Sequence, residues 1–199
     1  MRTNPLFQWK GDKRGVKRLG LFRHAKSSWE DMGVRDFDRA LNDRGKRGAA
    51  LMGRHIADYG AKWSMVLASP AVRVRETLDI ARGAMNETLP AAIWDERLYL
   101  APAEAMIDVT REKAGAEDVY SVLLCGHNPG LHELVFDLVR DDGTCPLLDR
   151  ITGKFPTAAF AVIELDIASW DDLASGCGKL VHLARPRDLD PSLGPEKVR

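Results

Sequence analysis

Short apolar runs alternate with amphipathic stretches along the middle of the chain. Between the runs, apolar side chains recur every three or four residues, which is typical of helices that cover one face of a sheet. Runs of strand length lie at 18–22, 64–68, 119–125 and 158–165, and a last one at 179–183. The alternation predicts an α/β fold of three layers, in which helices flank a mostly parallel central sheet.

Capping signals mark where three of the predicted helices begin. Asn42 is a good N-cap for a helix that ends at Gly60. Ser69-Pro70 and Asn128-Pro129 each combine a capping side chain with a proline suited to the first helical position. We therefore expect these two helices to start directly after predicted strands.

Length and composition indicate one globular domain. The 199 residues are 45% hydrophobic and 29% charged, which suffices for a self-stabilising core. Unpatterned ends predict a flexible N-terminal extension over 1–15, a domain over 16–189 and a C-terminal tail over 190–199. Lysine plus arginine equals aspartate plus glutamate, 29 against 29, so no overall field favours nucleic acid or a membrane as partner.

Cysteine usage and the absence of a signal segment predict a cytoplasmic location. The cysteines Cys125, Cys145 and Cys177 are odd in number and widely spaced. The chain starts without an apolar signal segment and has no uninterrupted apolar stretch of about 18 residues. No residues have the spacing of a metal site, so no metal or cofactor is expected. Cys125 ends an apolar strand and is interpreted as a buried, inert thiol.

Polar side chains follow three predicted strands at the point where each strand ends. They are Arg23-His24, the segment from Ser69 to Arg73, and Gly126-His127. In open α/β sheets, ligands bind at the carboxyl ends of the strands. Two of these segments lead into helix N-termini, which attract anions, and each guanidinium group can bind two phosphoryl oxygens. Together they predict a phosphate-binding pocket.

The same segments resemble the motifs of a known family. LFRHAKS (21–27) resembles the RHG signature of the histidine phosphatase superfamily, SPAVRVRET (69–77) its second-arginine motif, and CGHNPGL (125–131) its second-histidine motif. DRALNDRG (38–45) and HLARPRDL (182–189) resemble stretches of the SixA-like phosphohistidine phosphatases. The chain is identified as a member of this superfamily, in its SixA-like branch, and the resemblance implies a phosphoglycerate mutase-like fold.

The resemblance also implies covalent catalysis through a phosphorylated histidine. His24 would be the nucleophile, while Arg23, Arg73 and His127 would bind phosphoryl oxygens and neutralise their charge in the transition state. Ala25 stands where most members carry glycine, which is a familiar variant in the SixA-like branch.

The proton donor for the leaving group is less defined. Glu96, in DERLYLA (95–101), resembles the acid of the mutase motif, while Glu30 and Asp31 are rivals because they lie close to the nucleophile in the sequence. Glu30 also stands where phosphoglycerate mutases carry a phosphate-binding asparagine, which counts against mutase activity. A phosphohistidine leaving group needs little acid help, because its imidazole can take a proton from water.

Three functions are compatible with these residues. A phosphatase that acts on phosphohistidine in a protein is favoured, because no large insertion between Arg73 and His127 would close over the site. A phosphatase of a small phosphorylated metabolite is the alternative, and a non-catalytic phosphate-binding module is a third, disfavoured by the intact motifs. His55 and His132 are interpreted as packed or surface residues and Trp29 as loop packing. The sequence leaves the oligomeric state open.

Overall fold

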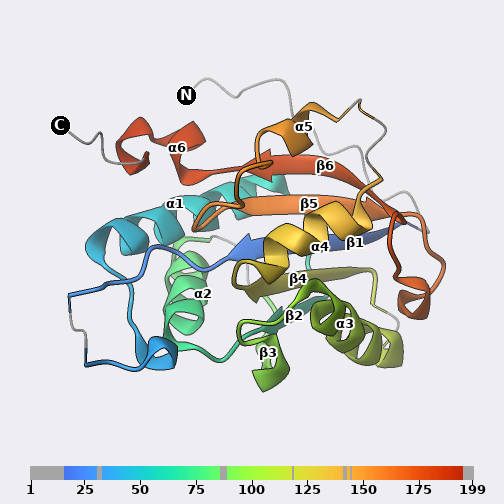
Figure 1. The fold of residues 1–199 in the computed structure, drawn as a ribbon, viewed down its shortest axis with the longest axis horizontal. Helices are drawn as coiled ribbons and strands as arrows, with labels where there is room; N and C mark the ends of the chain where they lie inside the picture. The colour runs from blue at the N-terminus through green and yellow to red at the C-terminus, as the bar shows by residue number, and fades with distance from the viewer. Residues whose placement is uncertain are drawn as a thin grey trace.

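A six-stranded sheet with the order β3-β2-β4-β1-β5-β6 forms the centre of the fold (Figure 1). The first four strands run parallel, and β5 is antiparallel to both of its neighbours, so the sheet is mostly parallel, as predicted. The computed structural model describes residues 16–30, 33–85, 89–117, 119–140, 143 and 145–194. The strands are β1 (Lys17–Arg23), β2 (Met65–Ala68), β3 (Ala92–Trp94), β4 (Ser121–Gly126), β5 (Phe160–Leu165) and β6 (Gly178–Ala184).

Helices cover both faces of this sheet, which confirms the three-layer architecture. One apolar cluster joins α1 and α2 to one face, and a second joins α3 and α4 to the other. The α-helices are α1 (Asp43–Tyr59), α2 (Val72–Ala84), α3 (Ala103–Glu117), α4 (Gly130–Leu138), α5 (Pro146–Asp149) and α6 (Pro186–Leu189). The 3-10 helices are η1 (Asp36–Asp38), η2 (Glu96–Leu98), η3 (Trp170–Asp172) and η4 (Pro191–Leu193).

Helix α1 begins and ends where its sequence signals predict. The Asn42 side chain accepts a hydrogen bond from the Gly45 N–H at 2.8 Å, and this satisfies one of the unpaired donors of the first turn. Gly60 ends the helix in the left-handed conformation at φ 78°, which glycine adopts without steric cost.

The other two capping predictions were wrong. Helix α2 begins at Val72 with no side-chain cap, and the Ser69 hydroxyl lies 2.8 Å from Nε2 of His127 instead. Helix α4 begins at Gly130, and Nδ2 of Asn128 donates to the Phe155 carbonyl at 2.9 Å. Ser69 and Asn128 thus make long-range contacts, and neither side chain caps the helix that follows it.

Strand β3 lies just before Glu96, where the sequence predicts a strand, but the pattern does not give its bounds. It has three half-buried residues at the edge of the sheet, too few to set a period. Its register with β2 still matters, because Ala68 pairs with Trp94 and the chain after β3 therefore emerges beside the end of β2.

The chain after β6 packs back onto the domain. Arg44 of α1 donates a hydrogen bond to the Leu193 carbonyl at 2.8 Å and a second one to the Gly194 carbonyl. Residues 190–194 of the predicted tail are therefore held against α1. The predicted N-terminal extension at 1–15 and the rest of the tail lie outside the described residues.

Within the described part of the chain, no helix combines the length and the apolar character needed to cross a membrane. The three cysteines are free thiols, and Cys125 is buried, as expected from its place at the end of β4. Burial raises the pKa of the Cys125 thiol, which keeps it protonated.

The crossing of α1 and α2 requires glycine at position 53. A β-carbon at Gly53 would overlap the main-chain atoms of Ala81, whereas a β-carbon at Gly83, near the end of α2, would meet open space. The two glycines therefore differ in packing although both lie in helices.

We predict opposite stability effects for alanine at these two glycines. Gly53→Ala forces the helices apart and should cost about 1–3 kcal/mol, which lowers Tm by several degrees. Gly83→Ala should raise Tm slightly, since alanine favours a helix by up to about 1 kcal/mol over glycine. Thermal unfolding followed by circular dichroism measures both, and equal changes in Tm would contradict the packing argument.

Candidate active site

The ends of β1, β2 and β4 bring the candidate residues to one edge of the sheet. In the parallel register, Arg23 pairs with Gly126 and Ala68 with Cys125, so the segments that follow emerge side by side. They enclose a cavity of ≈ 360 Å³. The residues that line it are Arg23, His24, Lys26, Ser27, Trp29, Asp36, Arg39, Arg73, Leu100, His127, Asn128 and Thr157.

His24 is held in one tautomer. Its Nδ1 lies 2.8 Å from the Ala25 carbonyl oxygen, and because a carbonyl only accepts hydrogen bonds, Nδ1 carries the proton. The lone pair is then on Nε2. Burial, aided by the charges of Arg23 and Arg73 and only partly opposed by the Ala25 hydrogen bond, lowers the pKa of His24 to about 3. The imidazole is therefore neutral and has a lone pair available for nucleophilic attack.

His127 lies beside His24, with 5.1 Å between the ring centroids. Its Nε2 contacts the Ser69 hydroxyl, and its Nδ1 is buried without a hydrogen-bond partner. Burial, followed by the interactions with His24 and Arg73, lowers the pKa of His127 to about 2. When the Ser69 hydroxyl donates to Nε2, Nδ1 carries a proton that has no hydrogen-bond partner among the described residues.

The two predicted arginines are anchored in different ways. Arg23, at the end of β1, donates from Nη1 to the Phe155 carbonyl at 2.6 Å. Arg73, in the first turn of α2, is almost fully buried and donates from Nη2 to Oδ2 of Asp36 at 2.9 Å and from Nη1 to the Asp36 main-chain oxygen. Both guanidinium groups are thereby oriented before any ligand is present.

Several buried donors at this cavity lack a partner. Nε of Arg23, Arg39 and Arg73 and Nδ1 of His127 are buried and form no hydrogen bond. A buried donor without a partner costs about 1–3 kcal/mol, and native proteins rarely leave several of them together. Their concentration around one cavity indicates a site for an anion that accepts several hydrogen bonds.

Asp36 and Arg39 also belong to the site, although neither was predicted from the sequence. Asp36 binds Arg73, accepts from the Tyr99 hydroxyl at 2.7 Å and lies 3.2 Å from Arg39. Partial burial tends to raise the pKa of Asp36. The hydrogen bond from Tyr99 and the charge of Arg73 outweigh burial and lower this pKa. Arg39 also donates to the Ser27 hydroxyl at 2.6 Å. Arg39 belongs to the run DRALNDRG, and the resemblance of this run to SixA-like proteins could have indicated it. No local pattern marks Asp36.

Comparison with known proteins identifies the family. Residues 19–98 match the model of the histidine phosphatase superfamily, branch 1. An uncharacterized protein of Mycobacterium tuberculosis is 35% identical over 167 residues, which cover 83% of this chain and 99% of that protein. The chain belongs to the histidine phosphatase superfamily.

Solved structures narrow the assignment within this superfamily. A candidate phosphohistidine phosphatase SixA from Nakamurella multipartita is 26% identical with a TM-score of 0.73, covering 88% of this chain and 99% of that one. A second candidate SixA, from Agrobacterium tumefaciens, is 28% identical with a TM-score of 0.68, covering 85% and 99%. The chain lies in the SixA-like branch and has the phosphoglycerate mutase-like fold, and these likenesses assign it to the phosphatases.

Two of the acidic residues weighed as proton donors, Glu96 and Glu30, do not line the cavity of this SixA-like chain. Glu96 begins η2 and is exposed, and Glu30 is exposed as well. Asp31 lies outside the described residues. Among the lining residues that the structure describes, the acidic one is Asp36, whose carboxylate is ionised and hydrogen-bonded. The role of Glu96 as proton donor stays a prediction.

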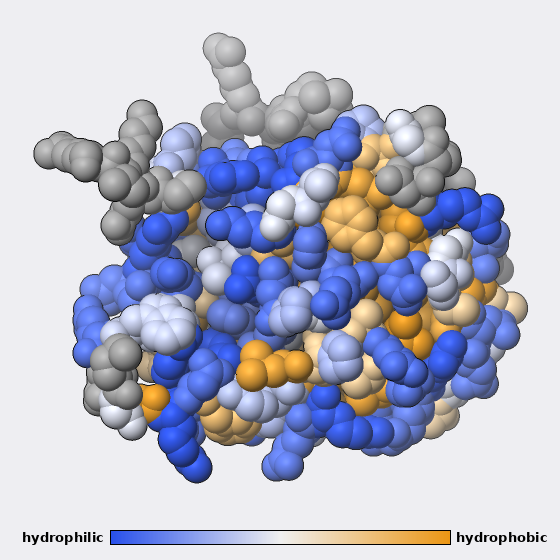
Figure 2. Space-filling model, in the orientation of Figure 1, coloured by the Kyte–Doolittle hydropathy of each residue, from blue (hydrophilic) through white to orange (hydrophobic). Residues whose placement is uncertain are grey.

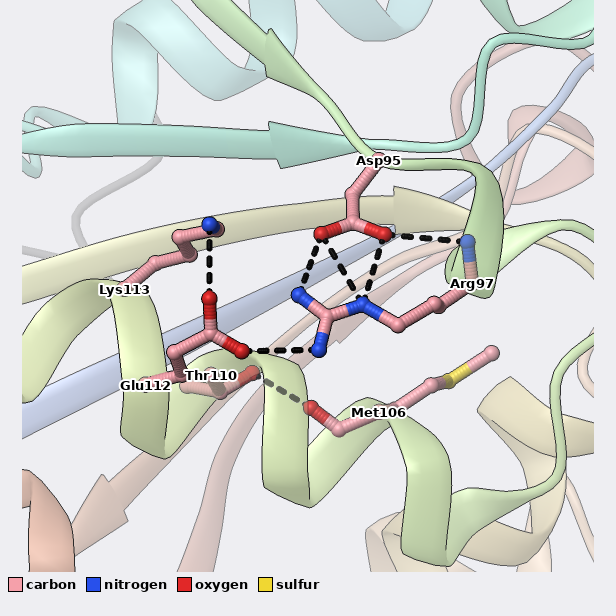
Figure 3. A network of polar contacts seen from close by, with 6 residues as sticks. All are labelled: Asp95, Arg97, Met106, Thr110, Glu112 and Lys113. Carbon is pink, nitrogen blue, oxygen red and sulfur yellow. Dashed lines mark hydrogen bonds and ion pairs between the residues drawn. The ribbon is translucent and has the colours of Figure 1, made fainter.

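A polar network fixes the segment that follows β3 (Figure 3). Arg97 binds both carboxylate oxygens of Asp95 and donates to Glu112 of α3 at 2.7 Å. This ties η2 to α3, and after η2 Tyr99 donates to Asp36 while Leu100 lines the cavity.

Of the other residues considered, Trp29 lies at the cavity, whereas His55 and His132 do not. His55 stacks on His182 at 5.1 Å, and His132 bonds to the Ile151 carbonyl, so neither His55 nor His132 lines the cavity. Trp29, in contrast, lies at the cavity with 62% of its surface exposed and with the Arg39 guanidinium 3.5 Å from its ring centroid. Within the described residues, no group of three or more His, Cys, Asp or Glu side chains is arranged to hold a metal ion.

The lowered pKa of His24 predicts a neutral ring throughout mildly acidic pH. Between about pH 8 and about pH 5, its side-chain NMR signals should not titrate, whereas the urea-unfolded chain should titrate near 6.5. Because the unfolded state takes up the proton first, stability should fall as pH drops below 6.5. Comparison with the His24→Gln spectrum assigns the signals. A native midpoint near 6.5 would contradict the burial argument.

Proposed function

We propose that this chain is a phosphatase that hydrolyses phosphohistidine on a protein through a phosphorylated intermediate on His24. The observation that carries the proposal is the neutral His24 ring, fixed by the Ala25 carbonyl beside buried, unpartnered donors of Arg23, Arg73 and His127. Such donors stabilise charge that develops on the phosphoryl oxygens. We also propose that the protein is located in the cytoplasm.

The reaction would run in two displacements. Nε2 of His24 attacks phosphorus, the P–N bond of the substrate breaks, and the departing imidazole keeps a proton taken from water. Water then attacks phosphorus on His24, phosphate leaves, and the His24 ring is neutral again. Arg23, Arg73 and His127 hold the phosphoryl oxygens in both steps, and each donor is worth about 3–4 kcal/mol by analogy with oxyanion holes.

Two features of the cavity support phosphohistidine in a protein as the substrate. The carboxylate found among the described lining residues, Asp36, is held ionised by its hydrogen bonds, so it is poorly suited to protonate an alkoxide. A phosphohistidine imidazole departs without a carboxylic acid. Leu100, half exposed, and Trp29 lie at the cavity and leave it accessible to a side chain on another protein.

The intermediate can be trapped directly. Brief mixing with labelled substrate and a denaturing quench without acid should leave an acid-labile, alkali-stable phosphoryl group on His24. Mass spectrometry of the digested protein locates the label. The His24→Ala protein should carry none, and full labelling of that variant would refute the assignment.

Loss of a phosphoryl donor should slow turnover strongly. Arg73→Ala should lower kcat/KM at least about a hundredfold, because one preorganised transition-state donor is removed. Arg75→Ala is the matched control, since Arg75 lies on the same helix but contacts Pro70 and Trp94 outside the cavity. Arg75→Ala should change kcat/KM by less than about threefold. Unchanged turnover in a folded Arg73→Ala protein would remove Arg73 from the site.

A comparison of two substrates tests whether Glu96 is the proton donor. If Glu96 donates the proton, Glu96→Gln should slow hydrolysis of an aryl phosphate by about 10²–10⁴-fold and that of a phosphohistidine peptide far less. Steady-state kcat on the two substrates measures the difference. Equal losses would indicate a structural role, and no loss on either substrate would exclude Glu96 as the donor.

A further inference from the structure

A second cavity adjoins the catalytic one. It measures ≈ 340 Å³ and shares Arg23, Lys26 and Thr157 with the catalytic cavity. Its other walls come from the start of α1, the segment 154–158 and the residues at and after the end of β6. On the face shown in Figure 2, hydrophilic residues cover the region between α1 and α6. We call this second cavity the basic cavity.

The lining of the basic cavity carries charge of one sign. Its charged residues are Arg23, Lys26, Arg44, Lys154, Arg185 and Arg187, and no aspartate or glutamate belongs to the described lining. The whole chain has a formal net charge of +0, so this concentration is local. Like charges around one concave surface repel one another and create a field that attracts anions.

Some of these cations are already engaged within the protein. Arg44 donates to the main-chain oxygens of Leu193 and Gly194. Arg185 forms an ion pair with Asp188, with 2.8 Å between Nη2 and Oδ1. The Arg44 guanidinium therefore holds the chain after β6 against α1, whereas the Arg185 guanidinium is engaged within the segment that follows β6.

The other rim cations have no such partner. Lys26, Lys154 and Arg187 are exposed, and within the described residues none of the three forms an ion pair. Long exposed cationic side chains select a ligand by its negative charge more than by the geometry of one anionic group. A single fixed phosphate would be bound better by arginine guanidinium groups that have no other partner. The exposed cations therefore favour several carboxylates on a flexible segment as the ligand.

We propose that the basic cavity binds acidic side chains that flank the phosphohistidine of the protein substrate. The inference rests on the proposed function. Because the two cavities share Arg23, Lys26 and Thr157, a phosphohistidine in the catalytic cavity places its neighbouring residues against Lys154 and Arg187. The basic cavity would thereby select among phosphorylated proteins by the charge around the modified histidine.

The test compares matched phosphohistidine peptides. One peptide carries aspartate and glutamate on both sides of the phosphohistidine, and the second carries asparagine and glutamine at the same positions. The wild-type protein should show a kcat/KM for the acidic peptide about tenfold or more above that for the neutral one, mainly through KM. The ratio should fall as ionic strength rises, because salt screens exposed charges.

Variants then locate the effect. The double variant Lys154→Gln/Arg187→Gln should bring the ratio of the two kcat/KM values down to within about twofold of one, since it removes two of the exposed cations that would pair with the acidic side chains. The control is Arg54→Gln/Lys62→Gln, which removes one arginine and one lysine that are exposed and lie outside both cavities. This control should keep the wild-type ratio. Thermal unfolding verifies that both double variants are folded.

The outcomes separate the inference from the function on which it rests. Equal kcat/KM for both peptides in the wild-type protein would overturn the inference and leave the proposed function standing. A high ratio that survives in Lys154→Gln/Arg187→Gln, or falls equally in the control, would also overturn it. Hydrolysis of an aryl phosphate without hydrolysis of either peptide would overturn the proposed function and the inference with it.

Discussion

The parallel pairing of β1 with β4 is the constraint on which the site depends. Because the two strands run in the same direction and end in register, His24 and His127 leave the sheet at the same edge and lie with their rings 5.1 Å apart. A shift of the register by one residue would turn each side chain to the opposite face of the sheet. Both rings are also buried, and burial is the first cause of their lowered pKa values.

The second constraint on the site is the arrangement of charged side chains around the cavity. Arg23, Arg39 and Arg73 converge on one cavity, and Asp36 offsets part of their charge by bonding to Arg73 and Arg39. The remaining donors, Nε of each arginine among them, have no hydrogen-bond partner among the described residues. Under the proposed function, a phosphoryl group would supply the acceptors that these donors lack.

Under the two proposals, one scaffold would combine chemistry with selection. His24, Arg73 and His127 follow strand ends or lie in the first turn of α2, and all three are buried. The basic cavity next to it depends on long side chains near the surface, including those that follow β6. Surface side chains can change the choice of substrate without disturbing the buried donors, since their contributions are small and separate.

The sequence alone determined the α/β layering, the boundaries of α1 and the positions of Arg23, His24, Arg73 and His127 at strand ends or in the helical turn that follows. These follow from local periodicity, from capping and from motifs, which are all properties of neighbouring residues. The motifs also placed the chain in its superfamily.

Only the tertiary structure decided which polar groups meet. Ser69 contacts His127 and caps no helix, and Asp36 enters the site from η1, which no sequence pattern marks. Glu96 follows a strand end as the sequence predicts, yet it remains exposed, while Tyr99 bonds to Asp36 and Leu100 lines the cavity. Such pairings join residues far apart in the chain, and their geometry depends on how the layers pack, which local preferences do not encode.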